Sequence, residues 1–124
     1  MSKVLIVDDD KNMVFLLTKL LQMDGYQVIS EARPAEVLNT IRRAKPDVVL
    51  MDVHLADGNG LEILMRILAD AEIGKTPVVM ASGEDVAYKG QQGGANGFIL
   101  KPYSPDALNA VLKKAMGATH GAQT

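Results

Sequence analysis

The side chains best suited to chemistry in this sequence stand directly after short runs of apolar residues. They are two neighbouring aspartates, a later aspartate, a serine and a lysine: Asp8, Asp9, Asp52, Ser82 and Lys101. Carboxylates that are brought close together repel one another, and a divalent cation removes that conflict. Ligands that offer only oxygen suit Mg²⁺ or Mn²⁺. The residue types therefore predict a site for one of these cations, if the chain brings the carboxylates together.

A serine hydroxyl and a lysine ammonium beside such a cation would complete a site for a phosphoryl group. The cation and the ammonium would neutralise oxygen charge, the hydroxyl would donate a hydrogen bond, and a carboxylate would act as the nucleophile. A single aspartate at a strand end is more often a turn or cap residue, so the hypothesis depends on the whole set. Asp10 is expected to cap the helix that follows it and is left out of the site.

Five short apolar runs, most of them rich in β-branched residues, predict the strands that position these side chains. A run that is apolar on both faces fits a strand covered on both sides. The predicted strands are residues 4–7, 26–29, 48–51, 78–81 and 97–100.

Segments of helical period lie between and after these strands. The first predicted helix covers residues 11–24 and ends before Gly25, a suitable residue for leaving a helix. Pro34 is expected at the first position of the second helix, where its missing N–H costs nothing. The third covers residues 60–70, and the fourth covers residues 85–92, where glycines weaken the pattern. The fifth begins after Ser104 as its cap.

Five strands that alternate with helices predict an α/β fold with a doubly wound, five-stranded parallel sheet. The expected arrangement is flavodoxin-like, with strand order 2-1-3-4-5. All the candidate side chains would then meet at the carboxyl edge of one sheet. Strands 1 and 3 flank the point where the winding reverses, which is where such folds bind ligands.

The length of 124 residues fits one compact domain, expected over residues 1–118, with a disordered tail over residues 119–124. The absence of cysteine excludes disulfides and thiolate chemistry. The net charge of −2, without a basic run, gives no support for direct binding to nucleic acid or an anionic membrane. No apolar stretch suits a membrane span or a secretory signal, and a cytoplasmic location is expected.

Five stretches carry a resemblance to a known family: VLIVDD at residues 4–9, PDVVLMD at 46–52, LADGNG at 55–60, PVVMASG at 77–83 and ANGFILKP at 95–102. In this order and at these spacings, the sequence resembles the CheY-like receiver domains of two-component response regulators. The resemblance covers about residues 3–118. It implies a reversible phosphoryl switch rather than an enzyme that completes a turnover reaction.

The resemblance implies a role for each carboxylate. Asp52 would be the phosphoacceptor and would also bind the metal, which would be Mg²⁺ or Mn²⁺. Asp9 would be a direct metal ligand and Asp8 would act largely through water. The backbone carbonyl of His54 would complete the protein's share of the coordination.

The resemblance also implies how the signal would leave the site. Ser82 would swing toward the phosphoryl oxygens, Lys101 would pair with them, and Phe98 stands at the position of the switch aromatic. The Lys101–Pro102 peptide bond is typically cis in such domains. The expected output surface consists of the fourth predicted helix, the fifth strand and the fifth helix. Its partners would be a sensor histidine kinase or histidine phosphotransfer protein and a downstream protein target.

Two residues depart from the pattern that the resemblance implies. Ala56 stands where proline is usual, so the loop after Asp52 is expected to be less rigid. Gly83 replaces the usual alanine and frees the backbone beside the serine. The resemblance further implies that the side chains of His54 and Glu84 occupy positions that tune hydrolysis of the acyl phosphate in such domains.

Two alternative functions use the same residues. One is an interaction module that works without phosphorylation, although such modules usually lack an acid or the lysine. The other is a phosphohydrolase of the haloacid-dehalogenase type, for which Asp8 and Asp10 have the required spacing. The short chain and the position of Asp52 fit that class poorly.

Overall fold

The computed structural model describes residues 2–56, 58–83 and 94–120, and within them the chain forms a five-stranded parallel sheet. The strands lie in the order β2-β1-β3-β6-β7. Their bounds are Lys3–Val7 (β1), Gln27–Glu31 (β2), Val48–Asp52 (β3), Val78–Ser82 (β6) and Gly97–Leu100 (β7). Because β6 and β7 are the fourth and fifth strands of this sheet, the predicted fold class and order are confirmed.

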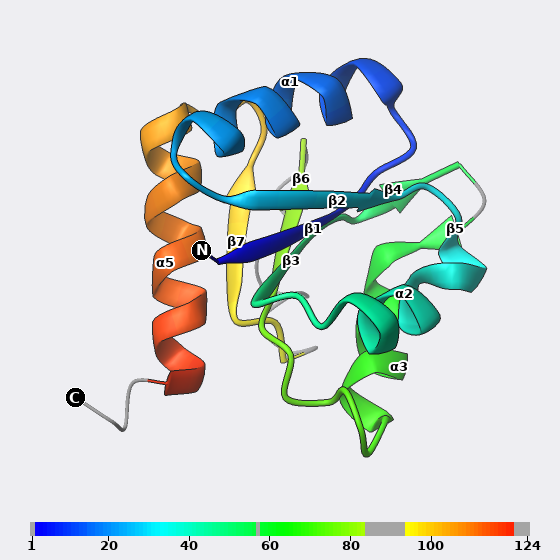
Figure 1. Ribbon diagram of the computed structural model, residues 1–124. Helices are drawn as coiled ribbons and strands as arrows, with labels where there is room; N and C mark the ends of the chain where they lie inside the picture. Colours follow the sequence, from blue (N-terminus) through cyan, green and yellow to red (C-terminus); the bar gives the residue numbers. More distant parts are fainter. Residues whose placement is uncertain (1, 57, 84–93, 121–124) are drawn as a thin grey trace.

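Helices cover both faces of the sheet, with α1 and α5 on one face and α2 and α3 on the other (Figure 1). Their bounds are Lys11–Met23 (α1), Val37–Ala44 (α2), Gly60–Ala69 (α3) and Pro105–His120 (α5). The helix predicted over residues 85–92 lies outside the described residues.

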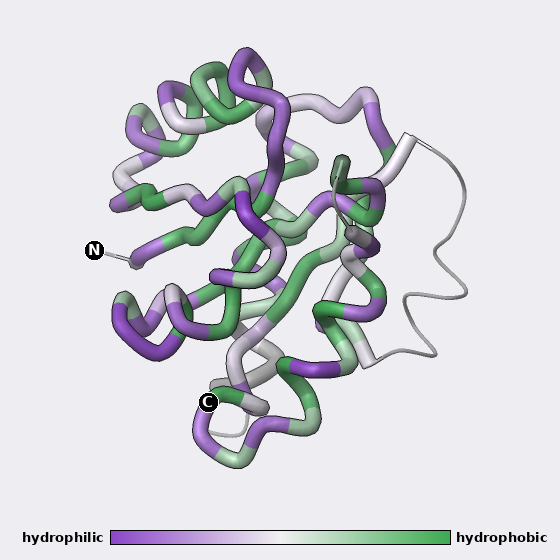
Figure 2. The backbone as a smooth tube through the Cα atoms, turned by 90° about the vertical axis from the view of Figure 1, so that its right-hand side faces the viewer, coloured by the Kyte–Doolittle hydropathy of each residue, from purple (hydrophilic) through white to green (hydrophobic). Residues whose placement is uncertain are grey.

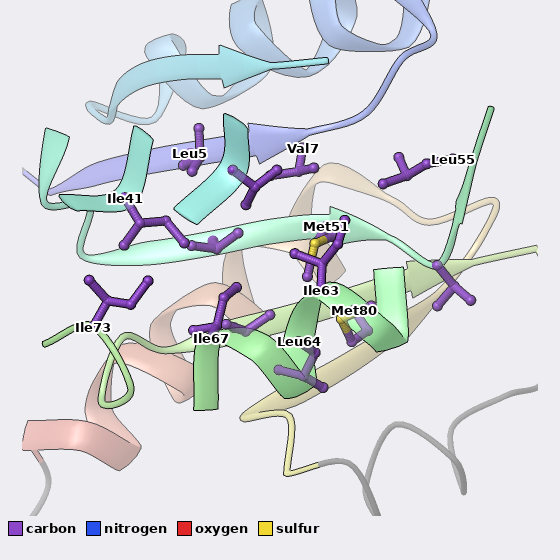
Figure 3. Packing of buried hydrophobic residues seen from close by; sticks show 14 residues of the cluster. Leu5, Val7, Ile41, Met51, Leu55, Ile63, Leu64, Ile67, Ile73 and Met80 are labelled. Carbon is purple, nitrogen blue, oxygen red and sulfur yellow. The ribbon is translucent and has the colours of Figure 1, made fainter. Parts of the chain in front are cut away.

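The central strands contribute alternate residues to two hydrophobic cores. Leu5 and Met51 point into the core beneath α2 and α3, part of which Figure 3 shows, and Ile6 and Leu50 point into the core beneath α1 and α5. Figure 2 shows that the inner strands are largely hydrophobic, whereas hydrophobic and hydrophilic residues alternate along the helices. Complete burial of one such side chain stabilises the fold by about 1.5–3 kcal/mol before entropy is counted. The two cores hold the strand ends in fixed positions.

The end of α1 explains why β2 begins one residue later than predicted. Gly25 has φ of 89°, and its N–H donates to the carbonyl of Gln22. The N–H of Tyr26 donates to the carbonyl of Leu21, which completes a Schellman motif. Tyr26 therefore belongs to the helix end, and Gln27 is the first strand residue.

Pro34 begins a 3₁₀ turn rather than the α-helix expected there. The turn covers Pro34–Glu36, and the N–H of Glu36 donates to the carbonyl three residues earlier, at Arg33. No side chain caps this turn, and α2 follows from Val37. The fixed φ of proline is compatible with either helix, so the sequence pattern could not separate them.

The last helix begins as predicted and continues further than predicted. Ser104 Oγ accepts a hydrogen bond from the N–H of Ala107, and Pro105 is the first helical residue. The helix extends to His120, two residues into the segment expected to be a tail. Residues 121–124 lie outside the described part of the chain.

The chain also forms a short hairpin, β4 (His54–Leu55) and β5 (Gly58–Asn59), between β3 and α3, which the sequence pattern did not indicate. Gly60 follows it as the first residue of α3, and its N–H donates to the carbonyl of Val53 at 2.8 Å. A Cβ at this position would lie 2.2 Å from the backbone oxygen of Asp52. This close approach fixes the hairpin against the end of β3.

We predict that Gly60→Ala lowers the free energy of unfolding by about 2 kcal/mol, because the added methyl group collides with rigid backbone. Urea denaturation measures the change. Gly117→Ala is the matched control, since a Cβ there has no neighbour within 4 Å and alanine favours the helix. Equal stability of Gly60→Ala and the native protein would contradict the prediction.

Candidate functional site

The register of β1 and β3 brings three aspartates to one edge of the sheet. Val7 pairs with Met51 across the two strands, so Asp8 and Asp9 emerge beside Asp52. Asp8 is buried, at 5% exposure, and its Oδ1 accepts a hydrogen bond from the N–H of Asp10 at 2.9 Å. The sheet therefore collects the predicted carboxylates at the winding reversal.

Lys101 lies between two of these carboxylates. Its Nζ is 2.8 Å from Oδ2 of Asp52 and 3.8 Å from Oδ2 of Asp8. The backbone holds the lysine in place, because its N–H donates to the carbonyl of Ser82 at 2.7 Å. The peptide bond from Lys101 to Pro102 is cis, as the resemblance implied. One ammonium thus neutralises charge at the ends of β1 and β3 together.

Ser82 and Phe98 lie on the strands nearest to this lysine. Ser82 ends β6 and is completely buried, one residue beyond the Ala81 that pairs with Asp52. Phe98 pairs with Met80 and is partly buried against the core beneath α2 and α3. Glu84, the other predicted tuning residue, lies outside the described residues.

The loop after β3 contacts the carboxylates through its backbone. The N–H of His54 donates to Oδ1 of Asp52 at 3.1 Å, while the His54 side chain is exposed. The N–H of Ala56 donates to Oδ2 of Asp9 at 2.5 Å. Asp10 does not join this group, because its Oδ1 caps α1 through the N–H groups of Asn12 and Met13. Its predicted role as a helix cap is confirmed.

Burial and like charge shape the electrostatics of the site. Burial raises the pKa of Asp8, and the negative charge of Asp52 acts in the same direction, while the N–H of Asp10 and the ammonium of Lys101 oppose it. Burial, together with the charges of Asp8 and Asp52, raises the pKa of Tyr103 to about 12. The sheet edge is therefore a region of concentrated negative charge that a single lysine only partly offsets.

The donor chemistry of this edge fits Mg²⁺, because Asp8, Asp9 and Asp52 offer carboxylate oxygens there and the sequence contains no cysteine. Over residues 2–56, 58–83 and 94–120, no group of three Asp, Glu, His or Cys side chains is arranged to hold a metal ion. In the same arrangement, Lys101 engages Asp52, and the N–H of Ala56 engages Asp9. Asp8, Asp9, Asp52 and the His54 carbonyl remain the predicted ligands.

Two residues near the carboxylates were missed by the sequence analysis. Ala56 contributes only a backbone N–H, which no side-chain pattern reveals. Tyr103 directly follows the Lys101–Pro102 pair and packs against the core beneath α1 and α5, beside an apolar cavity of about 350 Å³ that Leu17 of α1 also lines. Its place after a recognisable motif was the one signal that could have identified it.

Comparison with known proteins decides the family. The family model of the response regulator receiver domain matches residues 4–113. The chain is a response regulator receiver domain. Receiver domains belong to two-component signalling and are signalling domains rather than conventional enzymes. The phosphohydrolase alternative is thereby set aside, in agreement with the capping role of Asp10.

Relatives of this receiver domain occur alone and within longer proteins. Protein PilH of Pseudomonas aeruginosa is 33% identical over 119 residues, which cover 90% of this chain and 98% of that protein. The alkaline phosphatase synthesis transcriptional regulatory protein PhoP of Bacillus subtilis is 32% identical over 115 residues, covering 90% of this chain and 47% of that protein. The receiver domain thus spans about half the length of PhoP.

Solved structures share the same fold. The chemotaxis response regulator CheY4 of Vibrio cholerae has a TM-score of 0.84 at 30% identity, covering 93% of this chain and 98% of that chain. The BeF3-activated N-terminal receiver domain of Klebsiella pneumoniae RstA has a TM-score of 0.84 at 26% identity, with the same coverage. Among the helices that the structure describes in this receiver domain, none has the length and hydropathy of a membrane span.

We predict that Asp8→Asn raises the free energy of unfolding at pH 7 by about 1 kcal/mol in buffer containing EDTA, because it removes a buried charge. The raised pKa of Asp8 means that its ionisation opposes folding as the pH rises through that pKa. The gain should therefore disappear below about pH 4, where the unfolded side chain is protonated too. Urea denaturation across this pH range provides the measurement.

Asp10→Asn is the matched control for this prediction. Asp10 is exposed, and asparagine caps a helix as well as aspartate does, so the free energy of unfolding of Asp10→Asn should equal that of the native protein. A loss of stability in Asp8→Asn at pH 7 would show that the carboxylate stabilises the fold through Lys101 instead.

Proposed function

We propose that Asp52 accepts a phosphoryl group from a phosphohistidine of a sensor histidine kinase or a histidine phosphotransfer protein. The observation that carries this proposal is the position of Lys101, whose ammonium lies 2.8 Å from Asp52 and 3.8 Å from Asp8. A lysine held between two carboxylates at a strand edge is poised to meet the oxygens of a phosphoryl group.

The transfer forms a bond between a carboxylate oxygen of Asp52 and phosphorus as the phosphorus–nitrogen bond of the donor breaks. The imidazole of the donor leaves with the bonding electron pair and takes up a proton from solvent. Lys101 neutralises charge on the transferred oxygens, and the N–H of His54 orients the nucleophile by binding its other oxygen. Asp8, Asp9, Asp52 and the His54 carbonyl would hold Mg²⁺, which would supply further neutralisation of charge.

Phosphorylation would act as a switch because it adds about −1.5 to −2 charge at the edge of a rigid sheet. Ser82 is completely buried one residue beyond the strand partner of Asp52, and its hydroxyl would turn to donate to the new oxygens. We propose that this movement, with that of Lys101, shifts β6 and β7 and alters the environment of Phe98. The output surface would then include β7, α5 and the helix predicted over residues 85–92.

The target that we propose for this surface is another protein. Net charge of −2 and the absence of a basic run give a nucleic acid little to bind. The DNA-binding response regulator MtrA of Mycobacterium tuberculosis is about twice as long as this chain, and DNA binding is a property of that longer protein. A cytoplasmic location, where kinase and target would meet, is part of the same proposal.

Phosphorylation is tested with a small acyl-phosphate donor and Mg²⁺, followed by mass spectrometry of the intact protein. The native protein should gain one phosphoryl group, and Asp52→Asn should gain none, because the amide cannot act as the nucleophile. EDTA should prevent the modification, and Asp10→Asn should retain it as a matched acidic control. Failure of the native protein to react with several donors would reject the proposal, as would an adduct on Asp52→Asn.

The switch is tested by NMR with an aspartyl-phosphate mimic. Amide resonances of β7 and α5 should shift, and relaxation dispersion on the microsecond-to-millisecond timescale should change there, because a two-state element is biased. Amides of α2, on the opposite face of the sheet, should change much less. Changes confined to the strand ends around Asp52 would contradict a switch that reaches this surface.

A further inference from the structure

The hydrogen bond between Ala56 and Asp9 joins two parts of the site that lie 47 residues apart in the chain. The donor is a backbone N–H in the turn of the β4–β5 hairpin, and the acceptor is the partly exposed carboxylate that follows β1. At 2.5 Å it is shorter than the contacts of Asp52, since Lys101 Nζ lies 2.8 Å from Asp52 Oδ2 and the His54 nitrogen lies 3.1 Å from Asp52 Oδ1.

This hydrogen bond holds Asp9 in an arrangement that does not form a metal site. Like charges on Asp8 and Asp52 repel the carboxylate of Asp9, and the N–H of Ala56 attracts it toward the loop. No three acidic side chains of the described residues are grouped to bind a cation, although the backbone brings all three to one edge. The backbone therefore already places the three aspartates together, and only the orientation of the Asp9 side chain has to change for a cation to bind.

We propose that the N–H of Ala56 competes with a divalent cation for the carboxylate of Asp9 and thereby sets the affinity of the site. The proposal rests on the proposed function, because that function supplies the need for a cation. When Asp9 turns to the cation, the N–H of Ala56 loses its acceptor and becomes available to water. Cation binding and the conformation of the hairpin turn are then linked, and each affects the other by the same free energy.

The hairpin is built so that such a change stays local. Leu55 is buried at 8% exposure and belongs to the core beneath α2 and α3, where Figure 3 labels it. On the other side of the turn, Gly60 is held by its hydrogen bond to Val53. The Ala56 side chain is exposed between these two anchors. Release of its N–H therefore needs no movement of the core.

The competition is tested by Mg²⁺ titration followed by ¹H–¹⁵N NMR, with the native protein and two variants at Ala56. Ala56→Pro removes the N–H and should bind Mg²⁺ about 3-fold to 10-fold more tightly. Ala56→Gly keeps the N–H and should stay within about twofold of the native protein. In the native protein, the Ala56 amide should exchange with solvent faster when Mg²⁺ is saturating.

A third variant separates loss of the N–H from the rigidity of proline. Replacing the Ala56 amide by an ester, with lactic acid introduced at that position, exchanges the N–H for an oxygen without the ring of proline and should tighten binding as proline does. It also decides the question if Ala56→Pro fails to fold. Tighter binding by proline with no effect of the ester would overturn the proposal. Weaker binding by the ester would overturn it too, because the N–H would then orient Asp9 for the cation.

These readouts distinguish the two proposals. Equal Mg²⁺ affinity of the native protein, Ala56→Pro and the ester overturns the competition, whatever the result of phosphorylation. Differences in affinity as expected, without any phosphoryl adduct on native protein, uphold the competition and reject phosphoryl transfer to Asp52.

Discussion

The repulsion between carboxylates at one edge of the sheet is the constraint on which the site depends. Asp8 and Asp52 emerge from neighbouring strands, and Asp8 is buried, so their charges act through protein as well as water. The ammonium of Lys101, the residue that follows β7, offsets part of that repulsion. Because β6 lies between β3 and β7, the lysine must reach across one strand to bind Asp52. The contact between Lys101 and Asp52 therefore depends on the order and register of the strands.

The rest of the fold supplies the rigidity that keeps these charges together. Two hydrophobic cores, one on each face of the sheet, fix the central strands from both sides. Their burial supplies the stability against which a buried Asp8 is tolerated. The edge of the sheet thus keeps an unfavourable electrostatic arrangement, which the proposed cation and phosphoryl group would change. Without repulsion between the carboxylates, the electrostatic free energy of the site would change less when a cation or a phosphoryl group is added.

The loop after β3 is the part of the site in which backbone groups act in place of side chains. The N–H groups of His54 and Ala56 bind Asp52 and Asp9, and Gly60 returns the chain within contact of the Asp52 carbonyl. An alanine at position 56 matters because it carries the N–H that a proline would lack. Residue identity acts there through the main chain, which links the proposed phosphoacceptor, the predicted metal ligands and the start of α3.

The sequence alone determined the fold class, the strand order, the helix caps at Asp10 and Ser104, and the polar residues at the strand ends. These features follow from local patterns, because apolar period, β-branching and capping residues act over a few positions. Only the tertiary structure decided that Lys101 binds Asp52 and that Ala56 binds Asp9. It also revealed the β4–β5 hairpin and the 3₁₀ turn at Pro34. Such contacts depend on sheet register, backbone direction and side-chain rotamers across distant parts of the chain, which no local pattern encodes.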